Sequence, residues 1–231
     1  MPKRHPGQRK LPHDRHEHED DVFIAKVLET MGWAKANQQL LTVLGVAVIL
    51  GIAALLYYGN YRDAITRQAA NELEAIHQTA ALGDTEGAKG QLVVFLERFG
   101  GTPYAGEARM LLGELYLSSG EPQQALAVLE PMAATPRDPL ELQAAALLGA
   151  AYEQEGRWSD ATATYLRIAD RSDLDFQVRD ALAAAARIRT MQGDTAGAVQ
   201  LYERILSELD ESAPTRGVYE MRLAELRQAS T

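Results

Sequence analysis

The chain has 231 residues, of which 46% are hydrophobic, and its formal net charge is −9, so it is long enough for one ordinary domain and an additional segment. Residues 1–39 contain seven Lys and Arg and six Asp and Glu, which leaves the rest of the chain acidic, with a net charge of −10. An acidic surface repels phosphate backbones and excludes nucleic acid as the expected partner, and the lack of cysteine excludes disulfides and thiolate metal or catalytic sites.

Residues 1–21 form a charged, histidine-rich tail. Large aliphatic side chains are nearly missing from it, so it cannot bury enough apolar surface to offset the entropy of ordering, and we expect it to be disordered. His13, His16 and His18 lie among carboxylates and have the chemistry of a weak transition-metal site. Their spacing implies no fixed geometry, and we therefore expect a solvated tail and no metal site.

Residues 22–39 predict an amphipathic juxtamembrane helix. Phe23, Val27, Met31 and Ala34 recur at helical spacing. Such a helix lies in the headgroup region of a membrane, or it is simply a helical lead into the segment that follows. The sequence leaves both roles open.

Residues 40–58 predict a transmembrane helix. The run is apolar apart from Thr42 and two glycines, and a helix of this length reaches roughly 28 Å, about the thickness of a hydrocarbon core. Trp33 and Tyr61 flank it where interfacial aromatic residues are expected. A buried core helix fits less well, because core helices rarely run this long without a charge. A cleaved signal peptide is disfavoured because the run begins some 40 residues into the chain.

The basic residues of the tail set the expected orientation. Within about 20 residues of the span there are two basic residues on each side, so these residues favour neither orientation. The distal cluster Lys3, Arg4, Arg9, Lys10 and Arg15 favours a cytoplasmic N-terminus. We therefore expect a single-pass protein of the bacterial inner membrane with residues 59–231 in the periplasm; the opposite orientation is the alternative. Ala47 and Gly51, one turn apart in the span, are compatible with a homo-oligomer.

In the rest of the chain, four glycines that are each followed five residues later by an alanine recur at a nearly constant spacing. The copies are Gly83/Ala88, Gly120/Ala125, Gly156/Ala161 and Gly193/Ala198, spaced 37, 36 and 37 residues apart. A period of this size is typical of solenoids built from helix pairs, in which each unit buries its apolar face against its neighbours. The domain is thus predicted to be a surface for holding other molecules.

Two copies share further residues. Leu112-Gly113-Glu114-Leu115-Tyr116 and Leu148-Gly149-Ala150-Ala151-Tyr152 precede their turn glycines in the same register. Gly113 and Gly149 predict a close approach of two helices, and Gly120 and Gly156 predict left-handed helix ends. This pattern resembles the tetratricopeptide repeat. The predicted fold is all-α: a transmembrane helix, then a tetratricopeptide-like solenoid of about four helix pairs at residues 69–102, 106–139, 142–175 and 179–212, and a C-terminal capping helix at residues 215–228.

The turn Phe99-Gly-Gly-Thr102-Pro103-Tyr104-Ala105 extends the resemblance. A charged tail, one span and a repeat with this turn look like the family of the ancillary subunit of the bacterial Sec translocon. The resemblance implies protein partners, namely the Sec translocon, periplasmic chaperones or secreted chains. Similar turns also occur in periplasmic repeat proteins that coordinate envelope assembly, which gives a second hypothesis: a scaffold for peptidoglycan or outer-membrane assembly complexes.

The family register also places residues along an inner groove formed by the first helix of each pair. Their mixture of apolar and acidic side chains suits an extended peptide with apolar and basic residues. The expected groove residues are Leu73, His77, Glu107, Met110, Glu114, Leu117, Gln143, Glu153 and Arg187, with Ala146, Ala150, Asp180 and Ala183 in the same register.

Catalytic motifs are missing from the sequence. There is no Gly-rich phosphate loop before a helix, and His77, the only histidine outside the tail, has no obvious nucleophile near it. We therefore expect a non-enzymatic, membrane-anchored interaction protein without a cofactor, bound to lipid through its span. The third hypothesis is a metal-responsive membrane sensor whose input is the histidine-rich tail.

Overall fold

The computed structural model describes Lys26 and residues 28–229, and every regular element among these residues is a helix. The chain divides into two units, residues 1–62 and residues 63–231. Each is described by itself below. The predicted disordered tail, with His13, His16 and His18, lies outside the described residues.

The first unit contains a short helix and the start of a long one. Residues 28–36 are helical, Asn37 is a turn, and helix α2 then runs from Gln38 to Ala81. The run 40–58, predicted to be a separate span, therefore belongs to a 44-residue helix that continues without a break into the first repeat. The physical reason is that nothing stops the helix earlier: it contains no proline, and the first glycine with a positive φ is Gly83.

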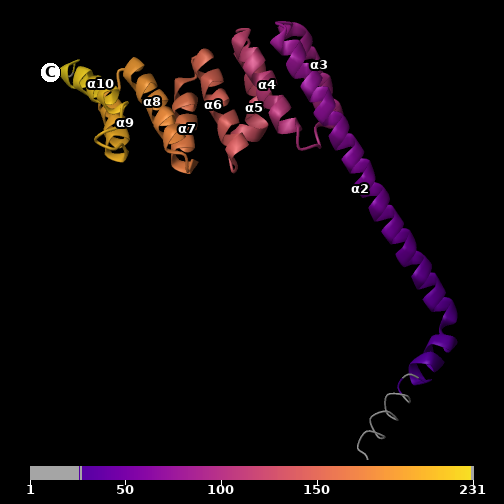
Figure 1. The fold of residues 1–231 in the computed structure, drawn as a ribbon. Coiled ribbons are helices and arrows are strands. Elements are labelled where there is room, and N and C mark those ends of the chain that lie inside the picture. The colour runs from indigo at the N-terminus through magenta and orange to yellow at the C-terminus, as the bar shows by residue number, and fades with distance from the viewer. Residues whose placement is uncertain (1–25, 27, 230–231) are drawn as a thin grey trace, which may run out of the picture. The chain divides into compact units, whose positions relative to one another are not determined.

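The second unit stacks helix pairs along one direction (Figure 1). The C-terminal part of α2 pairs with α3, and three further pairs and a last helix follow in sequence, so the predicted solenoid of four pairs and a capping helix is confirmed. Their bounds are α3 Thr85–Phe99, α4 Ala105–Ser118, α5 Pro122–Ala133, α6 Pro139–Gln154, α7 Trp158–Arg171, α8 Asp175–Met191, α9 Thr195–Glu208 and α10 Arg216–Ala229. Pro139, expected to close a unit, instead begins α6, where its missing N–H leaves no hydrogen bond unmade.

The turn inside each pair is built on the repeated glycine. Gly120 and Gly156 have φ values of 75° and 72°, as predicted. The next residue, Glu121 or Arg157, donates its backbone N–H to the carbonyl of Tyr116 or Tyr152 at 2.8 Å. This is the 6→1 bond of the Schellman motif, which satisfies a carbonyl that the helix end would leave unpaired.

Gly113 and Gly149 are confirmed as points of close helix approach. A Cβ on Gly113 would lie 2.8 Å from the Leu129 side chain, and one on Gly149 would lie 2.7 Å from the Tyr165 ring. Both distances are too short for a real contact. In these two pairs, the glycine therefore lets the second helix pack a large side chain directly against the backbone of the first.

The buried apolar side chains form two adjoining clusters along the stack. One cluster joins α2, α3 and α4 around Phe95 and Leu112, and a second joins α5 to α10 around Leu148 and Leu182. Tyr116 packs against both clusters. At the C-terminal end, Leu223 and Leu226 of α10 complete the second cluster, which is the role predicted for a capping helix.

The Thr-Pro turn between α3 and α4 has a structural role. The Thr102 hydroxyl donates to the Phe99 carbonyl at 2.8 Å, and the Thr102 amide donates to the same carbonyl at 2.9 Å. Phe99 and Ala105 are both buried. This turn thus joins the first two helix pairs by local hydrogen bonds and packing.

Candidate functional site

The structure divides the predicted groove residues into exposed and buried positions. Glu107, Glu114, Gln143 and Arg187 are exposed, whereas His77, Met110, Leu117 and Glu153 are partly buried, and Leu73 is buried. Met110 and Leu117 pack against the second core cluster. Met110 and Leu117 are therefore partly covered by the core, and most of the polar members of the set are exposed.

Leu73 was wrongly placed in the groove. It is 2% exposed and belongs to the cluster of Ala69, Ile76 and Phe95. Positions 69, 73 and 76 lie on one face of a helix, and α2 turns this face toward α3. The side chain is therefore part of the core and cannot contact a partner.

Two pairs of side chains within the predicted groove set are in contact. His77 Nε2 lies 3.1 Å from a carboxylate oxygen of Glu107, which joins α2 to α4. Arg187 donates to Glu153 at 2.6 Å and joins α8 to α6. The His77 and Glu107 side chains are 39% and 53% exposed, so their interaction adds little stability.

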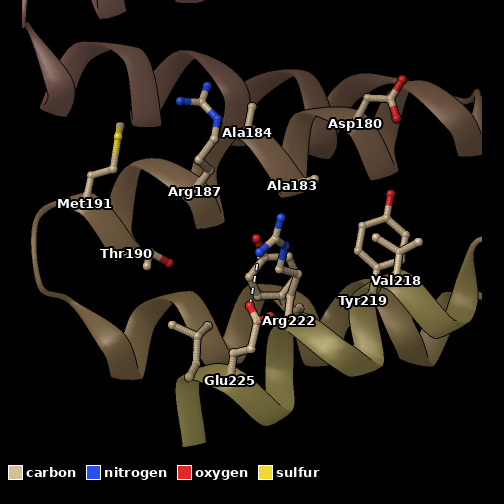
Figure 2. Close-up of a pocket in the computed structure, with 12 residues that line it drawn as sticks. Asp180, Ala183, Ala184, Arg187, Thr190, Met191, Val218, Tyr219, Arg222 and Glu225 are labelled. Atoms are coloured by element: carbon tan, nitrogen blue, oxygen red, sulfur yellow. Dashed lines mark hydrogen bonds and ion pairs between the residues drawn. The ribbon is translucent and has the colours of Figure 1, made fainter. Parts of the chain in front are cut away.

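A pocket of about 770 Å³ lies between α8 and α10 (Figure 2). Tyr202 of α9 also lines it. From α8 it takes three residues of the predicted register, Asp180, Ala183 and Arg187, and adds Ala184, Thr190 and Met191; from α10 it takes Val218, Tyr219, Arg222, Glu225 and Leu226.

Sequence reasoning missed the α10 side of this pocket because it treated that helix only as a cap. A signal was present. Arg222 follows Val218 by four residues, and Glu225 and Leu226 follow Arg222 by three and four, as on one helix face. That face carries charges as well as the apolar residues that a cap needs.

The two arginines of the pocket are engaged by carboxylates of the same chain. Arg187 binds Glu153, and Arg222 lies 3.0 Å from Glu225. Asp180, in contrast, makes no ion pair or side-chain hydrogen bond with any residue that the structure describes. The uncompensated charge in the pocket is therefore negative. Burial raises the pKa of the Tyr202 hydroxyl, which stays neutral at physiological pH.

The described residues also show what chemistry the surface lacks. Within Lys26 and residues 28–229, no group of three or more His, Asp and Glu side chains is placed to hold a metal ion. The tail histidines lie outside this range. An apolar pocket with charged residues at its edge is suited to recognising part of a larger molecule.

Stacked helix pairs joined by turns at positive-φ glycines are the architecture of an α-solenoid repeat protein. A family model described as "Tetratricopeptide repeat-like domain" matches residues 32–228, and the chain belongs to that family. Repeats of this family generally mediate interactions between proteins.

Among solved structures, the fold is similar to the crystal structure of nearly identical TPR-like repeats assigned to a kinesin light chain of Podosopora anserina. The TM-score is 0.57 at 21% identity, and the match covers 71% of this chain and 87% of that one. A variant of the same repeats matches with the same TM-score and identity and is covered to 86%. These likenesses concern the fold alone. A search of functionally characterised proteins by sequence found no match.

Proposed function

We propose that the protein is a membrane-anchored, non-enzymatic interaction protein of the bacterial envelope, which binds partner polypeptides along the inner face of its repeats. Its partners are secreted chains, the Sec translocon or periplasmic chaperones, and the repeats lie in the periplasm. The observation that carries the proposal is one chain holding both a long exposed apolar helix and a repeat domain with a pocketed inner face.

The apolar half of α2 supports the membrane anchor. The described residues contain one helix long and apolar enough to cross a membrane, and none of its apolar stretch is buried. Leu50, Leu55 and Leu56, for example, are each more than 60% exposed. Transfer of one such side chain out of water contributes about 1.5–3 kcal/mol. A run of them is therefore expected to lie in lipid.

The extent of the family match gives further support. The matched range begins at residue 32, so it includes the apolar segment together with all the helix pairs. The anchor is accordingly proposed as a shared part of this architecture. The Thr-Pro turn, which the translocon-like resemblance singled out, is a well-packed joint between α3 and α4 in this chain.

Charge supports a polypeptide partner with basic residues. The chain beyond residue 39 has a net charge of −10, and Glu114 on the inner face has no ion pair or side-chain hydrogen bond to any described residue. Complementary charge speeds association and selects partners more than it adds affinity.

The topology can be tested with single cysteines, because the natural chain has none. Ser212→Cys and Gln8→Cys place reporters on either side of the span. After the outer membrane is permeabilised, an impermeant maleimide is expected to label the Ser212→Cys protein in intact cells. It should label the Gln8→Cys protein only after lysis. The reverse pattern would place the repeats in the cytoplasm and overturn the proposed location.

Partner binding needs its own experiment. Glu114→Cys, labelled with a benzophenone maleimide, should cross-link to nascent secreted chains or translocon subunits on irradiation. Gln200→Cys on the exposed surface of α9 is the matched control and should give few products. Equal products from both positions, or none from Glu114→Cys in a functional strain, would contradict binding along the inner face.

A further inference from the structure

We propose that the pocket between α8 and α10 anchors a bulky apolar side chain of the partner polypeptide, next to a Lys or Arg that binds Asp180. The inference rests on the proposed function, because it names what one part of the same inner face recognises. Figure 2 shows the two walls: Asp180 and Arg187 project from α8, and Val218, Tyr219, Arg222 and Glu225 project from α10.

The apolar part of the pocket has room for a large side chain. Ala183 and Ala184 are small residues that line the pocket from α8, and the apolar residues Val218 and Leu226 line it from α10. The volume of about 770 Å³ lies within the range of sites that enclose most of a ligand. Burying a Leu or Phe side chain there would raise affinity roughly ten- to hundred-fold.

The charged residues that line the pocket favour a basic residue next to the ligand's apolar side chain. Glu153 engages Arg187, and Glu225 engages Arg222, so an acidic ligand would have to displace a carboxylate that is already bound. Asp180 is exposed and has no ion pair with a described residue. A Lys or Arg of the ligand can bind it without breaking an existing interaction.

The position of the pocket favours a chain over a small molecule. Arg187 lines the pocket and also binds Glu153 of α6, so the pocket borders the surface of the preceding helix pair. A ligand that fills the pocket can therefore continue over the first helices of the stack. Solenoid proteins commonly bind extended polypeptides along several successive repeats.

The test uses the full-length protein in detergent micelles and three fluorescent peptides, with binding measured by anisotropy. The basic peptide is Gly-Ser-Lys-Phe-Leu-Lys-Ser-Gly. The acidic peptide has Glu in place of both Lys, and the polar peptide keeps the Lys and has Ser in place of Phe and Leu. We expect the basic peptide to bind most tightly and the polar peptide to bind at least about ten-fold more weakly.

Two variants address the two parts of the site. Ala183→Trp fills the apolar space and should lower the affinity for the basic peptide at least about ten-fold. Asp180→Lys, at an exposed position, should weaken binding of the basic peptide about three- to ten-fold and strengthen binding of the acidic one. Asp173→Lys makes the same charge change in the exposed α7–α8 loop and should change both affinities less than about two-fold.

Three outcomes would overturn the inference: equal binding of the basic and acidic peptides, equal effects of Asp180→Lys and Asp173→Lys, or no binding of any peptide. None of these outcomes would contradict the proposed function if the Glu114→Cys protein still cross-links to its partners. In that case partners bind the inner face away from this pocket. Loss of the Glu114→Cys products as well would mean that the proposed function fails.

Discussion

The Arg187 guanidinium donates a 2.6 Å hydrogen bond to Glu153, and the Tyr165 hydroxyl donates one of 2.7 Å to the other oxygen of the same carboxylate. One side chain of α6 therefore ties together α7 of its own pair and α8 of the next. The Glu153 side chain is only 15% exposed, so the carboxylate is held in place at the edge of the pocket. Burial, and then the hydrogen bond to Glu153, raise the pKa of Tyr165.

Glu153→Ala should destabilise the repeat domain by about 1–3 kcal/mol, because it leaves the buried Tyr165 hydroxyl without its acceptor. The matched control is Glu203→Ala. Glu203 binds Arg227 at the same distance of 2.6 Å, but the two side chains are 48% and 60% exposed, so its loss should cost less than about 1 kcal/mol. Urea unfolding followed by circular dichroism measures both. Equal costs would show that the buried hydrogen bond adds nothing.

Gly149→Ala should destabilise the protein by about 1–3 kcal/mol. The new methyl group would lie 2.7 Å from the Tyr165 ring, which has to move away from the helix pair. Gly90→Ala is the control: it lies inside α3, and a Cβ there meets nothing within 4 Å. That change should stabilise the protein by up to about 1 kcal/mol, because alanine favours the helix more than glycine does. Destabilisation by both changes alike would contradict a specific close approach at Gly149.

The sequence predicts the helix pairs well because their signals are local. The turn glycines, the two packing glycines and the apolar face of the last helix each depend on a few residues of one segment. The continuation of α2 past residue 58 was missed because a change from apolar to polar residues does not end a helix. Helices end where capping residues or prolines stop them.

The groove was harder to predict than the fold. Leu73 was misplaced because the family register does not state which face of α2 the α3 helix covers. In the structure this face contains Ala69, Leu73 and Ile76, which pack together in the core. The pocket needs both α8 and α10, which the sequence describes as separate elements. The pattern along α10 indicates which of its residues share a face, but it does not indicate that α8 lies opposite that face.

Glu121→Ala should lower the melting temperature more than Lys89→Leu does. The Lys89 side chain is 6% exposed and binds Glu121 and Glu86, while its ammonium group lies 5.4 Å from the centre of the Tyr116 ring. Removing Glu121 leaves a buried cation with a weaker set of partners, whereas leucine removes the buried charge itself. The next repeat supplies the precedent, because Leu126 occupies the equivalent position.

The Lys89 prediction is checked by thermal unfolding at pH 7. Lys89→Leu should stay within about 3 °C of the natural protein, and Glu121→Ala should fall by more than that. Glu97→Ala, on the exposed surface of α3, controls for the loss of a carboxylate. A larger fall for Lys89→Leu would mean that the ion pairs themselves hold the first two helix pairs together.

The repeat domain should lose stability between pH 10 and pH 12. Burial, followed by the hydrogen bond to Glu130, raises the pKa of Tyr152 from 10 to about 12. A group whose pKa is higher in the folded state contributes its full stability below pH 10, the unfolded value, and loses it as the pH rises through 12. Hydrogen bonds to Glu121 and Glu86 also raise the pKa of Lys89, so this group acts in the same direction at alkaline pH.

Tyr152→Phe isolates the tyrosine contribution, because it keeps the ring, whose centre is 4.5 Å from the Arg157 guanidinium, and removes the hydroxyl. Its melting temperature should fall less than that of the natural protein between pH 9 and pH 12, both measured on the full chain in micelles. Tyr57→Phe, in the apolar helix, removes a tyrosine without touching the repeat domain and should leave the pH profile unchanged. Parallel profiles for Tyr152→Phe and the natural protein would assign the alkaline loss to Lys89 and the other buried tyrosines.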